Sequence, residues 1–156
     1  MEPSVRVSND ILMLEHALKH RFIGIKSHVF LELKEAFRQV RNGIKNTDQR
    51  MQAEKCMHEI ESCYTYELAA LRAAFSAMDK KIIEPEGKNI LKKLLIFEKQ
   101  EKNAVNNMIL LFSKIGWAEE DENHKRFRIA AILKVYNSES AKSMELTKSL
   151  IGYHMF

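Results

Sequence analysis

The 156-residue chain has few of the residues that build turns, cross-links and sheets: five glycines, two prolines, two cysteines and one tryptophan. This scarcity argues against strands, because sheet proteins need frequent turns and runs of β-branched residues. The apolar runs are too short for a transmembrane helix, which needs about 20 predominantly apolar residues. Residues 1–6 also lack a basic segment followed by an apolar one, so the sequence predicts no signal peptide.

The two cysteines, Cys56 and Cys63, lie in a segment with helical periodicity. At a rise of about 1.5 Å per residue, their Cα atoms would be about 10.5 Å apart, beyond the roughly 6.8 Å limit for a disulfide. We therefore expect two reduced thiols in the core, as in a protein of a reducing, cytoplasmic compartment.

Motifs that bind nucleotides or activate a nucleophile are missing as well. The sequence contains no glycine-rich phosphate loop and no dinucleotide fingerprint. It also contains no Gly-x-Ser-x-Gly turn of the kind that presents a catalytic serine. The sequence therefore predicts a non-enzymatic protein without a cofactor.

What the chain does contain is helical periodicity. From Ile11 to Ile44, apolar residues recur every three or four positions in an 11-residue repeat. The resulting period of about 3.67 is close to the 3.6 residues per turn of a straight α-helix. Because this stripe keeps its phase across Gly24, it favours one continuous helix there, with a break near Ser27 as the alternative.

The periodicity of the whole chain predicts an all-α fold, an elongated antiparallel bundle formed as one domain. Three long helices are followed by two shorter C-terminal helices, and a loose arm precedes them at 1–8. Thr47 or Asp48 is the expected cap of the second helix, and Asn137 is the expected break between the last two. The predicted helices cover residues 9–45, 48–83, 86–115, 118–136 and 138–151.

The third predicted helix, 86–115, has polar residues where its apolar stripe should continue, and Glu101 is the residue in phase. The short connections between the predicted helices would place Glu101 near Arg72 and His20. A buried charge without a partner costs several kcal/mol, so we expect these three residues, with Glu98 as a further candidate, to form a polar layer that fixes the alignment of the helices. In the alternative, Glu101 stays exposed.

The first predicted helix is apolar on more than one face, which is a wider surface than a single inward face requires. This favours a protein–protein interaction module that acts through exposed apolar helix faces. Such a module would be an adaptor, a chaperone-like or regulatory bundle, or a homo-oligomer. The candidate interface residues are Met13, Phe30, Phe37, Phe127 and Tyr136.

A nucleic-acid-binding bundle is the first alternative. The net charge is +4 and the sequence pI is about 9.0, which permits an anionic partner. Each basic stretch is interleaved with glutamates, however, as on an ordinary mixed surface. The candidate phosphate-binding residues are Arg38, Arg41, Lys92, Lys93, Arg126 and Arg128.

A metal-binding bundle is the second alternative. His16 and His20 are four residues apart, so on a helix they share a face and can ligate one ion. The Glu-x-x-His motif of carboxylate-bridged metal bundles does not occur in the sequence. We therefore predict no metal site and retain the two histidines only as weak candidates.

Overall fold

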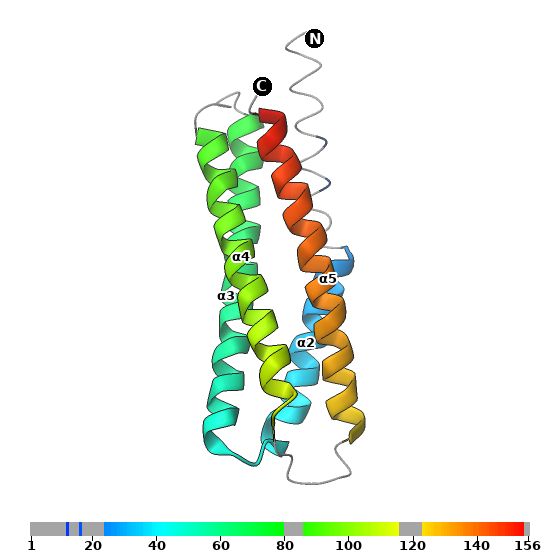
Figure 1. Cartoon of the computed structure of the whole chain (residues 1–156). Coiled ribbons are helices and arrows are strands. Elements are labelled where there is room, and N and C mark those ends of the chain that lie inside the picture. The colour runs from blue at the N-terminus through cyan, green and yellow to red at the C-terminus, as the bar shows by residue number, and fades with distance from the viewer. Residues whose placement is uncertain (1–11, 13–15, 17–23, 80–85, 116–122, 155–156) are drawn as a thin grey trace.

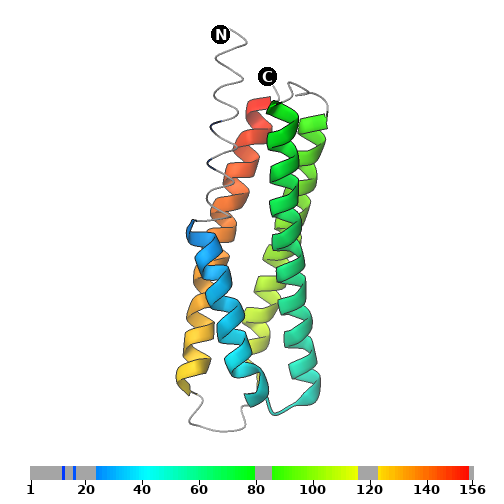
Figure 2. The same ribbon diagram turned by 180° about the vertical axis from the view of Figure 1, so that it is seen from behind.

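In the computed structural model of the chain, residues 12, 16, 24–79, 86–115 and 123–154 are described. Figures 1 and 2 show an elongated bundle of long helices, in which the shorter helix α2 covers only one half. Consecutive helices run antiparallel, and these residues contain no strand. The all-α prediction is therefore confirmed, but the described residues form four α-helices rather than the five predicted. They are α2 (Ile25–Val40), α3 (Thr47–Asp79), α4 (Glu86–Phe112) and α5 (Asn123–His154), and a short 3-10 helix, η1 (Arg41–Gly43), follows α2.

The first predicted helix, 9–45, is wrong in its continuity and in its end. Helix α2 begins at Ile25, because Gly24 has extended backbone angles (φ −89°, ψ −164°). A glycine inside a helix costs about 1 kcal/mol relative to alanine, and here the chain leaves the helix at that position. Ile25, the stripe residue at the start of α2, is exposed and Lys26 beside it is buried, whereas Val29 and Leu33 of the same stripe are buried as predicted. The predicted arm and most of the predicted helix before Gly24 lie outside the described residues.

The cap of α3 lies one residue earlier than predicted. The Asn46 side-chain oxygen accepts a hydrogen bond from the backbone N–H of Gln49 at 3.0 Å, so Asn46 rather than Thr47 or Asp48 satisfies a free N–H group of the first turn. The Gln49 side chain also donates to the Lys114 carbonyl at 3.4 Å. The start of α3 is thereby connected to the residues that follow α4.

The two short helices predicted at 118–136 and 138–151 are one helix, α5, which the structure describes from residue 123. The predicted break at Asn137 does not occur, because buried positions continue at helical spacing beyond it. Serines favour helix breaks when their hydroxyls compete for the backbone. Ser140 does not compete in this way, because its hydroxyl donates to the Glu101 carboxylate.

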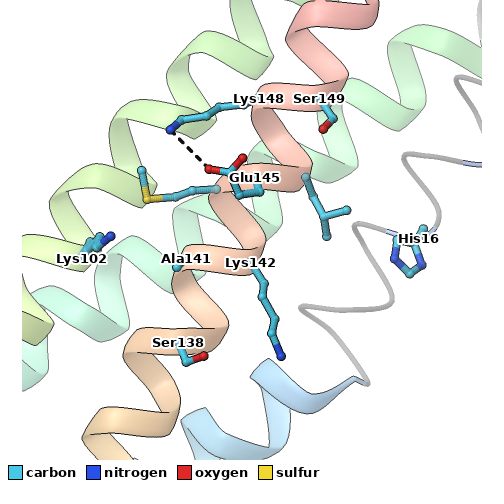
Figure 3. A pocket seen from close by; sticks show the side chains of 10 residues that line it. His16, Lys102, Ser138, Ala141, Lys142, Glu145, Lys148 and Ser149 are labelled. Atoms are coloured by element: carbon cyan, nitrogen blue, oxygen red, sulfur yellow. Dashed lines mark ion pairs between the residues drawn. The ribbon is translucent and has the colours of Figure 1, made fainter.

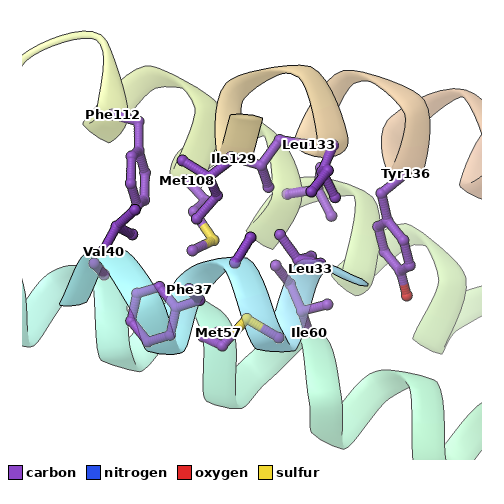
Figure 4. Packing of buried hydrophobic residues seen from close by; sticks show 14 of the residues in the cluster. Leu33, Phe37, Val40, Met57, Ile60, Met108, Phe112, Ile129, Leu133 and Tyr136 are labelled. Carbon is purple, nitrogen blue, oxygen red and sulfur yellow. The ribbon is translucent and has the colours of Figure 1, made fainter. Parts of the chain in front are cut away.

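A single apolar cluster fills the half of the bundle that contains α2, and we call it the apolar core. Phe30 stacks on Tyr64 within it, with ring centroids 4.2 Å apart. Burial of one such large side chain contributes about 1.5–3 kcal/mol. Figure 4 shows side chains of all four helices meeting in this core: Leu33, Phe37, Val40, Met57, Ile60, Met108, Phe112, Ile129, Leu133 and Tyr136.

Candidate functional site: a buried charged layer and a basic groove

Where α2 begins, each of the four helices contributes a polar side chain to the interior, and we call this set the charged layer. The Lys26 ammonium of α2 lies 2.6 Å from Oε1 of Glu101 in α4 and 3.4 Å from Oε2 of Glu67 in α3. From α5, the Tyr136 hydroxyl donates to Glu101 Oε2 and the Ser140 hydroxyl to Glu101 Oε1, both at 3.0 Å. All five residues are at most 1% exposed.

The Lys26 ammonium is held by aromatic rings as well as by carboxylates. It lies 6.0 Å from the ring centroid of Tyr64 and 5.6 Å from that of Tyr136, within the range of a cation–π interaction. An ammonium taken out of water without partners would cost several kcal/mol. The surrounding carboxylates and rings are therefore the reason a lysine is stable in the interior.

Two opposing effects act on the pKa of Glu101. Burial raises this pKa, whereas the Lys26 charge and hydrogen bonds with Glu67, Lys26 and Ser140 lower it, and the net result lies below the ordinary value of 4.5. The Lys26 ammonium therefore faces two carboxyl groups inside the bundle, those of Glu101 and Glu67.

The charge of Glu101 also affects the phenol beside it. Burial, followed by the charges of Glu101 and Glu67, raises the pKa of Tyr136 well above its ordinary value of 10.0. Tyr136 therefore keeps its proton and donates to the Glu101 carboxylate. This hydrogen bond joins α5 to α4 inside the bundle.

Further buried polar side chains lie beyond the charged layer, toward the end of α5. The Thr147 hydroxyl contacts both the Glu98 carboxylate and the Ser143 carbonyl oxygen, the latter at 3.1 Å. Glu139 pairs with the exposed ammonium of Lys142 at 3.1 Å. We call the charged layer together with Glu98, Glu139, Ser143 and Thr147 the polar half of the bundle.

The composition of this layer differs from the predicted one. Glu101 lies in it and Glu98 is buried nearby, whereas Arg72 is exposed on α3. His20 lies outside the described residues. The buried cation is Lys26, which sequence reasoning missed. It lies three residues before Val29 and seven before Leu33, so it shares the buried face of these two residues.

Most of the predicted interface residues lie in the interior instead. Phe30, Phe37 and Tyr136 belong to the apolar core, because α3 and α5 cover the wide apolar surface of α2. These three side chains are not available to a partner in this fold. Met13 lies outside the described residues, and Phe127 is 66% exposed.

A hollow of about 190 Å³ lies between α4 and α5, and we call it the basic groove. The Arg126 guanidinium lies over the Phe127 ring, 5.5 Å from its centroid. Leu110 is exposed on α4, the helix that forms the other wall. The lining residues of the groove are Ile109, Phe112, Ser113, Arg126, Ala130, Leu133 and Lys134.

The two chain segments that form the groove have a one-sided charge. Residues 102–115 and 123–138 together contain six lysines and arginines and no aspartate or glutamate. Two of these cations, Arg126 and Lys134, line the hollow itself. Four acidic residues at 119–122 connect the segments in sequence and lie outside the described residues.

Two of the predicted phosphate-binding residues are engaged with glutamates. Arg38 pairs with Glu35 at 2.6 Å, and Arg41 pairs with Glu54 at 2.9 Å. The hydrogen bond from Arg38 is the main cause of the lowered pKa of Glu35. Both arginines are exposed, so these pairs contribute little to stability, but each brings a carboxylate to the surface on which a phosphate would bind.

The other four predicted phosphate-binding residues lie at opposite ends of the bundle. Arg126 and Arg128 are in the first turns of α5, and the exposed residues Lys92 and Lys93 are near the start of α4. Because α4 and α5 run antiparallel, their starts are far apart (Figure 1). The predicted basic residues therefore do not form one continuous surface.

The histidine pair is only partly described. His16 is exposed and lines a second hollow, of about 580 Å³, against α5. Figure 3 shows that His16 and Lys102, another lining residue, lie on opposite sides of α5. His20 lies outside the described residues. Within the described part of the chain, no three His, Cys, Asp or Glu residues are placed to hold a metal ion together.

Comparison of the chain with protein-family models, curated proteins and solved structures found no match. Across the described helices, none combines the length and the apolar character that crossing a membrane requires. Cys56 and Cys63 are both free thiols, as their spacing predicts.

Proposed function

We propose that this protein is a non-enzymatic protein–protein interaction module that presents the basic groove to a partner. The observation that carries the proposal is an apolar hollow with cations on its lining, one of which, Arg126, also lies over the exposed Phe127 ring. Aromatic and arginine side chains next to a pocket are typical of the residues that dominate binding energy at interfaces. An adaptor, chaperone-like or regulatory role in a reducing, cytoplasmic compartment fits such a surface.

The charged layer supports the proposal, because it joins the two walls of the groove. Tyr136 and Ser140 of α5 both donate to Glu101 of α4, and these bonds are buried. Groove walls held in this way lose little conformational freedom when a partner binds, and preorganisation of this kind increases affinity.

A site-specific photocrosslinker tests the proposal. It is placed at Phe127 and, as a matched control, at Met51, which is 61% exposed on α3, a helix that does not line the groove. In cells, we expect a discrete adduct with another protein from position 127 and none from position 51. The adduct should disappear with the added substitution Ala130→Glu, which places a carboxylate in the hollow. Identical adducts from both positions, or none from either, would overturn the proposal.

A further inference from the structure

The apolar part of the basic groove has room for a single anchor. Its volume of about 190 Å³ is several times the roughly 30 Å³ that one water molecule occupies, which suits one large apolar side chain. Ile109, Phe112, Ala130 and Leu133 supply apolar walls. The exposed side chains of Leu110 on α4 and Phe127 on α5 lie on the two helices that form the walls, where they can contact further apolar residues of a partner.

The shape of the groove favours a helical partner. A groove between two packed antiparallel helices receives a third helix through its apolar face, with anchors at positions i, i+3 or i+4, and i+7. An extended peptide would instead pair with the edge of a sheet, and the part of the chain that the structure describes contains no strand. A helix is therefore the element that fits the two walls.

The charge of the groove selects among helices. Arg126 and Lys134 are eight residues apart, which is about 12 Å along α5, so acidic side chains two turns apart on a bound helix would meet both cations. Residues 102–115 and 123–138 contain no aspartate or glutamate, so these walls offer no carboxylate to the cations of a basic helix. A like charge placed opposite these cations would cost affinity.

Resting on the proposed function, we infer that the partner binds through an acidic amphipathic α-helix that places one leucine, methionine or phenylalanine in the hollow of the basic groove. Carboxylates on the flanks of this helix face Arg126 and Lys134. The contact is therefore apolar at its centre and ionic at its edge.

The test measures the binding of three labelled probes to the whole protein by fluorescence anisotropy. The first probe is a synthetic helix with leucines on one face and glutamates on its flanks. The second is the same peptide with lysines in place of the glutamates, and the third is a mixed-sequence DNA duplex. We expect the acidic helix to bind at least tenfold more tightly than the basic one and to lose affinity as salt increases. Equal or tighter binding of the basic peptide would overturn the inference. So would displacement of the acidic helix by the duplex, an outcome that would favour nucleic-acid binding.

Charge-reversal variants locate the site. The double variant R126E/K134E should bind the basic helix in preference to the acidic one. The matched control K92E/K93E changes two exposed lysines near the other end of the bundle and should leave both affinities unchanged. Unchanged circular dichroism and thermal unfolding would show that both variants fold. If the acidic helix fails to bind while the crosslink at Phe127 persists, the inference is wrong and the proposed function stands; if both fail, both are wrong.

Discussion

Around Val40, Met57 and Met108 the four helices pack only apolar side chains against one another, whereas around Lys26 they pack an ammonium, carboxyl groups and hydroxyls. Apolar burial has no preferred direction and tolerates small adjustments of position. A buried ion pair requires specific atoms at specific distances, and it destabilises the fold if one partner is lost. Apolar burial therefore contributes stability, both in the apolar core and at Leu71, Leu91 and Leu94 outside it, and the charged layer determines how the helices are aligned.

The largest expected effect comes from removing the buried cation. Lys26→Met leaves the Glu101 carboxylate buried without its ammonium and should lower the free energy of unfolding by about 3–5 kcal/mol, measured by chemical denaturation. The control Lys34→Met removes an exposed ion pair with Glu61 and should cost less than about 1 kcal/mol. Equal losses from the two variants would show that Lys26 is not buried as described.

The charged layer can also be made apolar, which removes the chemical difference between the two halves of the bundle. Replacing Lys26, Glu67 and Glu101 together by Met, Leu and Leu exchanges the charged groups for apolar ones of similar size. Such exchanges of a whole buried charge cluster are often neutral or stabilising. We expect the triple variant to recover most of the stability that Lys26→Met loses. A triple variant less stable than Lys26→Met would mean that the layer contributes stability of its own.

The apolar core should respond to cavities instead of charges. Leu33→Ala should cost about 2–5 kcal/mol, because the side chain is fully buried and its removal leaves a void. Leu31→Ala, on the exposed side of the same helix, should change stability by less than about 0.5 kcal/mol. Thermal and chemical denaturation of the two variants measure the difference, and similar losses would contradict the described orientation of α2.

A smaller effect is expected where one donor of the charged layer is removed and the ring is kept. Tyr136→Phe loses the hydrogen bond to the Glu101 carboxylate, which should cost about 1.5–3 kcal/mol. Tyr66→Phe makes the same chemical change on an exposed ring and should be neutral. Equilibrium unfolding of the matched pair isolates this hydrogen bond, and a neutral Tyr136→Phe would refute it.

The two halves should also differ in their response to acid. The pKa of Glu101 is below 4.5 in the folded chain, so the unfolded chain takes up the proton first as pH falls. The stability due to Glu101 is complete above about pH 4.5 and is lost as pH falls through the lowered pKa. In a curve of unfolding free energy against pH, this loss is the acid limb, and Glu101→Gln should flatten it. Leu33→Ala should lower the unfolding free energy at every pH and leave the acid limb unchanged. Unfolding measured between about pH 7 and pH 3 gives both slopes, and an unchanged limb in Glu101→Gln would exclude this role.

The smallest predicted difference concerns the two thiols. Burial, followed by the charge of Glu101, raises the pKa of Cys63 to about 12, so its reactive thiolate is scarce at neutral pH. Cys56 is only half-buried. With a thiol reagent at about pH 8, we expect Cys56 to react in the folded protein and Cys63 to react only on unfolding. Peptide mass mapping distinguishes them, and rapid labelling of Cys63 would contradict its burial.

Sequence periodicity predicts the apolar core well, because burial of apolar residues depends on spacing along a helix. Val29, Leu33, Ala36, Val40 and Ile44 are all buried as their stripe predicts. The same periodicity placed Phe30 and Phe37 at a binding surface, because it does not reveal which second helix covers a wide apolar face.

Lys26 illustrates what a single sequence does not contain. Lysine is almost never fully buried unless it is paired. Its partners, Glu67 and Glu101, are 41 and 75 residues away in the chain, so only the packed bundle brings them together. Glu101 was predictable because it interrupts an apolar stripe, whereas Lys26 is next to Ile25, the apolar residue that the stripe places in the interior at that point. The basic groove likewise depends on the pairing of α4 with α5.

Helix ends follow the same distinction between local and distant causes. Asn42 and Gly43, a pair typical of turns, lie in the 3-10 helix that follows α2 and mark its end. Helix α5 instead continues through Asn137, and beyond it the Ser140 hydroxyl donates to a carboxylate of α4. Residues typical of turns therefore mark the end of α2 but lie inside the continuous α5.

The origin of the charges in the layer has a consequence for how the chain folds. The ammonium comes from α2 and the carboxylate from α4, so an assembly of α3, α4 and α5 alone would enclose the Glu101 carboxylate without its counter-ion. Such an intermediate is penalised by several kcal/mol. Docking of α2 and closure of the interior are thereby made cooperative, and a partly assembled bundle is not a stable resting state.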